Sequence, residues 1–284
     1  MEDGKVWYRI VGTDQTRIPV LCLHGGPGAA HDYLETLEGF SDERPVIFYD
    51  QMGCGNSERP HDPEHWTIEC FVEELVQVRE ALGLSRIHLL GQSWGTILAA
   101  EYLLREKPDG VVSLIQSSPV MSFSRYIEDQ RNALEKLPEE QQKLIYDVEA
   151  NGDFTNPKYE NLMMDFYTEH LCRLDPWPDA MMRTMEKLDH GVYEYMQGPS
   201  EFTVTGTLRD YERVEDLKDL TLPVLYTCGE FDTCTPSTTE YFHHLTPGSE
   251  MIVFSDASHE HHLEKPEAYL AKVGDFMRRA ERRL

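Results

Sequence analysis

Short apolar segments alternate with amphipathic segments in the first third of the chain, and the alternation predicts strands and helices in turn. Each apolar segment is four to six residues long, is rich in β-branched or aromatic side chains and is bounded by Gly, Pro or Asp. These segments predict strands over 6–11, 20–23, 46–49 and 87–90. A helix is predicted over 68–82, because apolar side chains recur there at helical spacing before Gly83.

The same order continues through the next segment. A helix is predicted to begin near Trp94, and a further strand is predicted over 111–115. Strands that alternate with helices predict an α/β fold whose sheet is mainly parallel and is covered by helices on both faces.

The alternation stops between residues 121 and 205, where the pattern predicts helices separated by short loops. Strands resume at 223–228 and 251–254, and a final helix is predicted over 263–279. We therefore predict a discontinuous α/β core domain, 1–120 and 206–284, interrupted by a helical cap domain over 121–205. Methionine and aromatic side chains cluster in the predicted cap. Most are expected to form its core, and a few to line a substrate pocket.

Charge and composition exclude several kinds of partner. Of the 284 residues, 26 are Lys or Arg and 51 are Asp or Glu, which gives a formal net charge of −25. A surface of that sign repels nucleic acid and anionic lipid. No apolar run approaches the ~20 residues that span a bilayer, and residues 1–5 lack the features of a secretory signal. We expect a cytoplasmic protein with no nucleic-acid or membrane partner, as a monomer or small homo-oligomer.

A G-x-S-x-G motif lies between the strand predicted over 87–90 and the helix that follows it. The motif is Gly91-Gln92-Ser93-Trp94-Gly95. A nucleophile elbow requires this context, because the sharp strand-to-helix turn lifts the serine hydroxyl above the sheet and glycine leaves room on either side. Ser93 is therefore the candidate nucleophile. The alternative is a serine that only caps the helix between two glycines.

A serine hydroxyl needs a base, and the base needs an orienting group. His259 is preferred among the twelve histidines because it lies just past the strand predicted over 251–254, at the edge where parallel sheets carry functional groups. Asp232 precedes it in the expected chain order and follows another predicted strand. Glu230 and Asp256 remain alternative orienting acids.

Two backbone N–H groups are expected to stabilise an oxyanion. The Trp94 N–H is one, since it lies at a helix N-terminus beside Ser93. The second is expected in His24-Gly25-Gly26-Pro27-Gly28, which follows the strand predicted over 20–23. Gly26 is the preferred donor, and Gly25 is the next choice and a candidate substrate-binding residue.

The run His259-Glu260-His261-His262 also suggests a metal cluster. However, no H-E-x-x-H pattern is present, and adjacent histidines on one loop rarely converge on one ion. We therefore expect no metal ligands and no metal or organic cofactor.

With these motifs, the chain resembles the proline iminopeptidase family of α/β-hydrolases, especially the branch of the tricorn-interacting aminopeptidase. The resemblance covers nearly the whole chain. It rests on five segments: 24–28 (HGGPG), 50–57 (DQMGCGNS), 91–95 (GQSWG), 198–206 (GPSEFTVTG) and 229–232 (GEFD).

The resemblance implies an α/β-hydrolase fold with a helical cap over a Ser-Asp-His triad. It places the triad on Ser93, Asp232 and His259, and the carboxylate that holds the substrate's free amine on Glu201. Close relatives often carry a second Glu directly after the triad Asp, whereas this chain has Thr233. The second amine anchor of those relatives is therefore missing at this position.

Together these observations predict a serine aminopeptidase that releases N-terminal residues from short peptides through an acyl-enzyme. The expected partners are short peptides or amino-acid amides with a free N-terminal amine. An amino-acid amidase or small-ester hydrolase with the same triad is the alternative enzyme. A non-catalytic α/β-hydrolase is a further alternative, but it would be expected to lack a triad residue that this chain retains.

Overall fold

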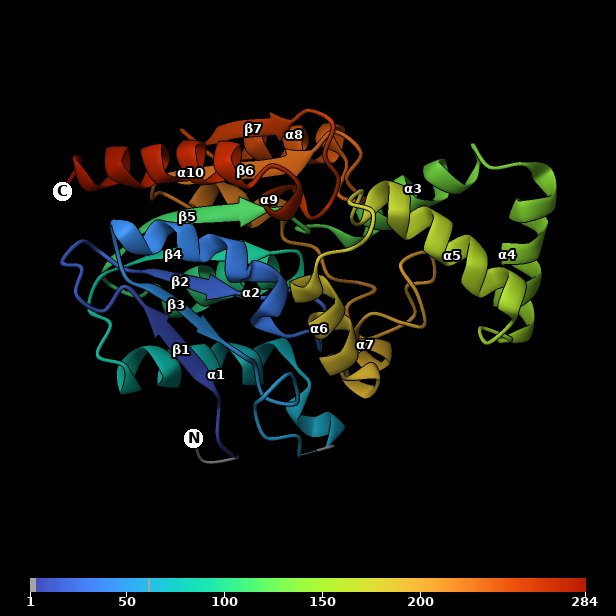
Figure 1. The fold of residues 1–284 in the computed structure, drawn as a ribbon, viewed down its shortest axis with the longest axis horizontal. Helices are drawn as coiled ribbons and strands as arrows, with labels where there is room; N and C mark the ends of the chain where they lie inside the picture. Colours follow the sequence, from blue (N-terminus) through green and yellow to red (C-terminus); the bar gives the residue numbers. More distant parts are fainter. Residues whose placement is uncertain (1–3, 61) are drawn as a thin grey trace.

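A seven-stranded sheet forms the centre of the protein in a computed structural model that describes residues 4–60 and 62–284 (Figure 1). The strand order is β1-β3-β2-β4-β5-β6-β7. β1 pairs antiparallel with β3, and the other neighbouring strands are parallel. The predicted α/β fold with a mostly parallel sheet is therefore confirmed. The strands are β1 (Tyr8–Val11), β2 (Val20–Leu23), β3 (Val46–Tyr49), β4 (Ile87–Gln92), β5 (Val111–Ser117), β6 (Val224–Gly229) and β7 (Glu250–Phe254).

Helices cover both faces of this sheet, because successive strand side chains point to opposite faces. On one face, Leu21 and its neighbours pack in one apolar cluster with α1 (Ile68–Ala81), α2 (Trp94–Glu106) and α8 (Pro236–Leu245). On the other face, Val20 and Cys22 pack in a second cluster with the 3-10 helix η1 (His31–Asp42) and α10 (Pro266–Glu281). The central strands β2, β3, β4 and β6 are buried along their whole length.

Local signals set the bounds of α1. The Thr67 side chain accepts a hydrogen bond from the Cys70 N–H at 3.2 Å, which caps the first turn. The helix ends before Gly83, which adopts a left-handed φ of 63°. The predicted helix over 68–82 agrees with this element.

Between β5 and β6 the described chain forms the 3-10 helix η3 (Val214–Asp219) and, before it, five α-helices. They are α3 (Phe123–Leu134), α4 (Glu139–Asn151), α5 (Pro157–His170), α6 (Asp179–Lys187) and α7 (His190–Met196). α3, α4 and α5 share an apolar cluster of their own with Phe202, and Figure 1 shows α4 and α5 extending away from the sheet. α6 instead packs against η1. The division into a core and a cap at residues 121 and 205 stays a prediction.

The C-terminal helix differs from its prediction. In place of one helix over 263–279, the structure has a short helix α9 (His261–Glu264) and then α10. Pro266 occupies the first turn of α10, where its missing N–H costs nothing. A proline inside a continuous helix would remove a hydrogen bond, so the chain ends one helix and begins another.

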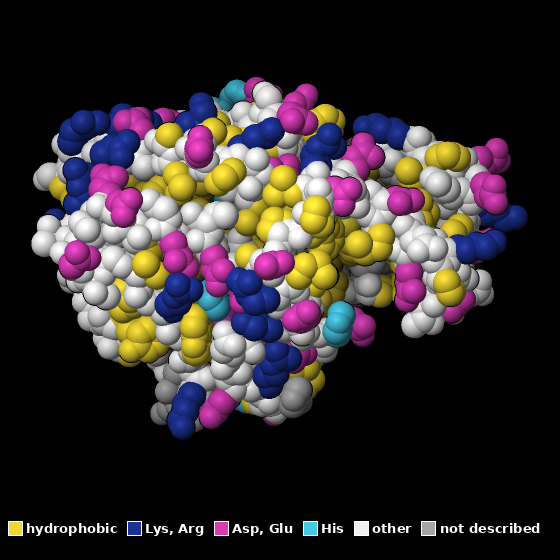
Figure 2. Space-filling model, viewed as in Figure 1, with side chains coloured by type: hydrophobic (Ala, Val, Ile, Leu, Met, Phe, Trp, Pro, Cys, Tyr) yellow, Lys and Arg dark blue, Asp and Glu magenta, His cyan; other side chains and the backbone are white. Residues whose placement is uncertain are grey.

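The protein surface mixes both signs of charge with scattered apolar side chains. Figure 2 shows acidic and basic side chains over the sheet domain, and hydrophobic side chains gathered between it and the projecting helices. In the part of the chain that the structure describes, no helix combines the length and the apolar character needed to cross a membrane.

The turn from β4 to α2 requires glycine on both sides of Ser93. A Cβ on Gly91 would lie 2.2 Å from the Gly95 carbonyl oxygen, and a Cβ on Gly95 would lie 2.2 Å from the Leu23 carbonyl oxygen. Both contacts are with backbone atoms that cannot rotate away. The glycines therefore allow α2 to approach β2 closely.

We predict that Gly95→Ala lowers the free energy of unfolding by about 3 kcal/mol or more, because the backbone must shift to relieve the contact. Gly274→Ala in α10 is the matched control, since the added Cβ would be no closer than 3.4 Å to any neighbour. The control should be neutral or up to about 1 kcal/mol more stable. Denaturant unfolding of the two variants measures the difference. Equal stability of both variants would contradict the role of Gly95.

Candidate active site

Ser93 lies at the turn between β4 and α2 in a strained backbone conformation. Its φ is 54° and its ψ is −122°, values that non-glycine residues rarely adopt. The turn is held because the Ser93 N–H donates to the Ser117 carbonyl at 2.9 Å, and the Ser93 carbonyl accepts from the Thr96 N–H at 2.8 Å. This geometry matches the nucleophile elbow that the motif predicts.

Asp232 and His259 form a buried hydrogen-bonded pair. The carboxylate oxygen Oδ1 of Asp232 lies 2.8 Å from Nδ1 of His259, and the two residues are 3% and 5% exposed. Asp232 follows β6 and His259 follows β7, so both come from the carboxyl edge of the sheet. The structure thus brings together these two predicted residues, which are far apart in sequence.

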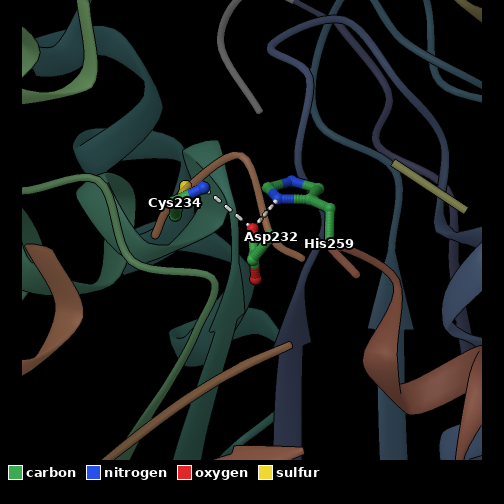
Figure 3. Close-up of side chains that lie close together, drawn as sticks. All are labelled: Asp232, Cys234 and His259. Atoms are coloured by element: carbon green, nitrogen blue, oxygen red, sulfur yellow. Dashed lines mark hydrogen bonds and ion pairs between the residues drawn. The ribbon is translucent and has the colours of Figure 1, made fainter. Parts of the chain in front are cut away.

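Further donors surround the Asp232 carboxylate. Oδ1 also accepts the Cys234 N–H at 2.9 Å, as Figure 3 shows, and Oδ2 accepts the Gly229 N–H at 3.2 Å. The Ser118 hydroxyl donates to Oδ2 at 2.7 Å. Burial alone would raise the pKa of Asp232, but His259 and these donors lower it below its ordinary value. The carboxyl group is therefore ionised.

The electrostatics of His259 follow from the same contact. Burial alone would lower its pKa, but the charge of Asp232 and the hydrogen bond to it raise the pKa well above 6.5. The Thr233 hydroxyl lies 3.0 Å from the same Nδ1. Both contacts involve Nδ1. The other ring nitrogen, Nε2, is therefore available to a group in the adjoining cavity.

That cavity has a volume of about 260 Å³ and lies beside Ser93 and His259. Its walls are largely apolar, with a few polar groups, which is typical of a small-molecule site. Three glutamates also line it: Glu194, Glu201 and Glu260. The apolar lining includes Leu171, Met181, Met185 and Leu188.

Glu201 has two tyrosine partners in this cavity. The Tyr193 hydroxyl donates to Oε1 at 2.6 Å, and the Tyr126 hydroxyl donates to Oε2. Burial and the nearby Glu201 charge raise the pKa of both tyrosines well above 10, so they remain donors. The predicted amine-binding glutamate therefore faces the same space as Ser93 and is held in place.

The two predicted glycines of the 24–28 loop have different surroundings. Gly26, with φ 111°, lines the cavity. The Gly25 N–H donates to the Tyr33 hydroxyl at 2.7 Å, so it has no free donor for a substrate, contrary to the expected role. Glycine is needed there for space, since a Cβ would lie 2.9 Å from the Ser93 Cβ. Trp94 begins α2 directly after Ser93.

The 50–57 segment forms hydrogen bonds with both the 24–28 loop and the start of α2. The Gln51 N–H donates to Nε2 of His24 at 3.0 Å, and the Trp94 indole donates to Oε1 of Gln51 at 2.8 Å. Asp50 accepts from His31 and Asn56. Burial would raise the pKa of Asp50, but these hydrogen bonds lower it to about 2. The segment therefore ties the 24–28 loop to the start of α2.

The histidines after His259 do not converge on one point. His261 Nε2 lies 2.9 Å from the Thr227 hydroxyl, whereas His262 Nε2 lies 3.1 Å from the Tyr33 carbonyl oxygen. Their rings are 6.2 Å apart and nearly perpendicular. Burial lowers their pKa values to about 4 and about 3, respectively. Both are neutral packing residues at ordinary pH.

Cys234 lies close to Asp232 and His259, and the three could offer donor atoms to a metal. However, burial raises the pKa of the Cys234 thiol to about 12, so it is not a thiolate ligand. The oxygen Oδ1 of Asp232 already accepts two hydrogen bonds (Figure 3). The donor chemistry is that of a hydrogen-bonded carboxylate.

Glu230 and Asp256, the alternatives to Asp232 as the orienting acid, make other contacts. Glu230 accepts the Asp256 N–H at 2.9 Å, and the exposed Asp256 pairs with Lys265 at 3.0 Å. Sequence reasoning missed Ser118, Tyr33 and the lining role of Glu260. Ser118 follows β5 at the same sheet edge as the predicted residues, and that position was the available signal.

Comparisons with known proteins agree with this geometry. A family model described as the alpha/beta hydrolase fold matches residues 18–266. A proline iminopeptidase of Heyndrickxia coagulans is 43% identical over 96% of this chain and 95% of its own length. The crystal structure of a proline iminopeptidase of Mycobacterium smegmatis is 38% identical, covers 98% of this chain and 96% of its own, and superposes with a TM-score of 0.89. The crystal structure of VinJ is 33% identical, with a TM-score of 0.93 over 99% of this chain and 97% of its own.

We predict that Asp232→Asn lowers the pKa of the His259 imidazole below 6.5. The carboxylate is the main group that stabilises the charged ring. Without it, burial favours the neutral ring and is opposed by the weaker effect of Cys234. Titration of the imidazole by NMR measures the change. Asp256→Asn is the matched control and should leave the imidazole unchanged. An unaltered or higher pKa in Asp232→Asn would contradict the assigned electrostatics.

Proposed function

This chain belongs to the proline iminopeptidase family of α/β-hydrolases, and on that premise we propose that it is a serine aminopeptidase that releases N-terminal proline from short peptides. One observation carries the proposal: Ser93, His259 and Glu201 line the same small cavity. A nucleophile, a base and a carboxylate for a free amine are thus available to one substrate molecule.

In the proposed reaction, the Ser93 oxygen attacks the carbonyl carbon of the N-terminal residue. His259 takes the serine proton and then gives it to the leaving amine, and Asp232 holds the ring and stabilises its charged form. The resulting acyl-enzyme is hydrolysed by water, which His259 activates in the same way. Sequence order and the pair's 2.8 Å contact both support these roles.

The oxyanion would be held by the N–H groups of Gly26 and Trp94. Gly26 lines the cavity, and Trp94 is the first residue of α2, where backbone N–H groups have no partner within the helix. Each such donor is worth about 3 kcal/mol of transition-state stabilisation. Gly25 is no longer a candidate, since its N–H is committed to Tyr33.

Glu201 would bind the substrate's α-ammonium. A charge-assisted hydrogen bond of this kind is worth about 1.5–3 kcal/mol. Tyr126 and Tyr193 hold the carboxylate from two sides, so little side-chain entropy is lost when the amine binds. The 260 Å³ cavity and its apolar walls suit a pyrrolidine ring.

An amino-acid amidase with the same triad is the second candidate. The observation that favours it is the Thr233 hydroxyl, which lies 3.0 Å from His259 Nδ1 and so faces the imidazole. Thr233 is neutral and cannot balance an ammonium. A single amine anchor, Glu201, would discriminate less between a peptide and an amino-acid amide.

Hydrolysis of proline arylamide, its N-acetyl derivative and proline amide tests the proposal. We predict that the wild type cleaves the free-amine arylamide and not the acetylated one. Glu201→Gln should lower kcat/KM for free-amine substrates by roughly 10- to 100-fold, because it removes the charge that holds the ammonium.

Glu194→Gln is the matched control, since Glu194 also lines the cavity but is exposed. The control should change the rate by less than threefold. Equal cleavage of free and acetylated substrates would overturn the role of Glu201. Absence of any cleavage by the wild type would overturn the proposed function, and preference for the amide over peptides would favour the amidase.

A further inference from the structure

Glu260 is a buried residue that lines the catalytic cavity, and one of its carboxyl oxygens has no hydrogen bond to the described residues. Its residue is 4% exposed, and its oxygen Oε2 has no hydrogen-bond partner among the described residues. It is the first residue after His259 in the chain. A buried carboxyl group without partners is costly to a fold, so a structural explanation has to be sought first.

No structural role accounts for it. Glu260 is the residue preceding α9, but its side chain does not cap that helix. The His262 ring lies 3.7 Å from Oε2, but it donates to the Tyr33 carbonyl and is neutral. Within 4–60 and 62–284, no lysine or arginine forms an ion pair with Glu260. The charge of His259 lowers the pKa of Glu260, but burial opposes it more strongly. Among the described residues, Oε2 therefore has no hydrogen-bonded counter-charge.

The backbone around Glu260 is nevertheless fixed. The Glu260 N–H donates to the Leu171 carbonyl at 2.9 Å, and the His259 N–H donates to the His170 carbonyl at 3.1 Å. Both acceptors lie at the end of α5, so the cap and the His259 loop hold each other. Burial raises the pKa of Glu260 to about 8, and a cation that entered the cavity would favour the ionised form.

Glu260 and Glu201 have different neighbours in the cavity. Glu201 contacts Tyr126 and Tyr193, whereas Glu260 lies near Tyr33 and His262. The proposed function, on which this inference rests, places the substrate's ammonium at Glu201 and its carbonyl at Ser93. His259 must then donate its proton to the leaving nitrogen, so the leaving group passes beside His259.

From this arrangement we propose that Glu260 binds a positively charged side chain on the residue that follows the scissile bond. The substrate class is thus short peptides with N-terminal proline and lysine or arginine in second position. Glu260 acts as a specificity residue, and it takes no part in bond cleavage. The strongly acidic composition of the chain also favours the approach of such cationic peptides.

Prolyl-lysine amide and prolyl-norleucine amide test the proposal, because they differ only by the ammonium group and carry no terminal carboxylate. The wild type should favour the lysine peptide in kcat/KM by roughly tenfold, the gain from one charge-assisted contact. In Glu260→Gln the ratio should fall to about one, with the norleucine peptide cleaved within threefold of the wild-type rate. Glu160→Gln removes an exposed carboxylate outside the cavity and should keep the wild-type ratio.

Each other outcome decides a separate point. A wild-type ratio of one or less would overturn the proposal, even if Glu260→Gln failed to fold. An unchanged ratio in folded Glu260→Gln would also overturn it. An equal loss on every free-amine substrate would make Glu260 an amine anchor and refute the leaving-group assignment. Absence of cleavage of both peptides by the wild type would refute the proposed function instead.

Discussion

The buried contact between Asp232 and His259 sets the requirement that the surrounding structure must meet. An ionised carboxylate without water is expensive, and removing any of its partners would leave an uncompensated charge. The fold meets this cost with the N–H groups of Gly229 and Cys234 and with the hydroxyl of Ser118. These groups come from the end of β6, the loop after it and the loop after the neighbouring parallel strand β5. The mostly parallel sheet therefore places these hydrogen-bond donors at one edge.

Two glutamates that line the cavity, Glu201 and Glu260, differ in the hydrogen bonds that their carboxyl groups make. Glu201 is supported by two tyrosines that stay protonated, so its charge is available but its position is fixed. Glu260 has no such support. A pocket with one supported and one unsupported carboxyl group can hold two cationic centres of a peptide on either side of the reacting carbonyl. The neutral His261 and His262 are buried and add no charge.

The sequence predicted the residues whose position follows from strand order, and it missed those that depend on packing. Ser93, Asp232 and His259 each follow a predicted strand, so topology alone was enough to bring them to one edge. Ser118 has the same position, but a serine after a strand is too common to be selected without contacts. Gly25 was the second choice of oxyanion donor and a candidate substrate-binding residue. Nothing in the sequence shows that the Tyr33 hydroxyl would accept its N–H. Glu260 was hidden in a run of histidines, and only burial distinguishes it. The chain breaks before α10 because of Pro266. The prediction of one helix over 263–279 gave more weight to the helical spacing of apolar residues than to this proline.

The central claim is that Ser93 is a nucleophile activated by the Asp232–His259 pair, and covalent labelling tests it most directly. A fluorophosphonate should modify the wild-type protein once, and mass spectrometry of its peptides should place the label on Ser93. His259→Ala should react at least 100-fold more slowly while still folding, although at a lower unfolding temperature, because Asp232 loses its partner. Labelling of another residue, or equal rates in both proteins, would contradict the account.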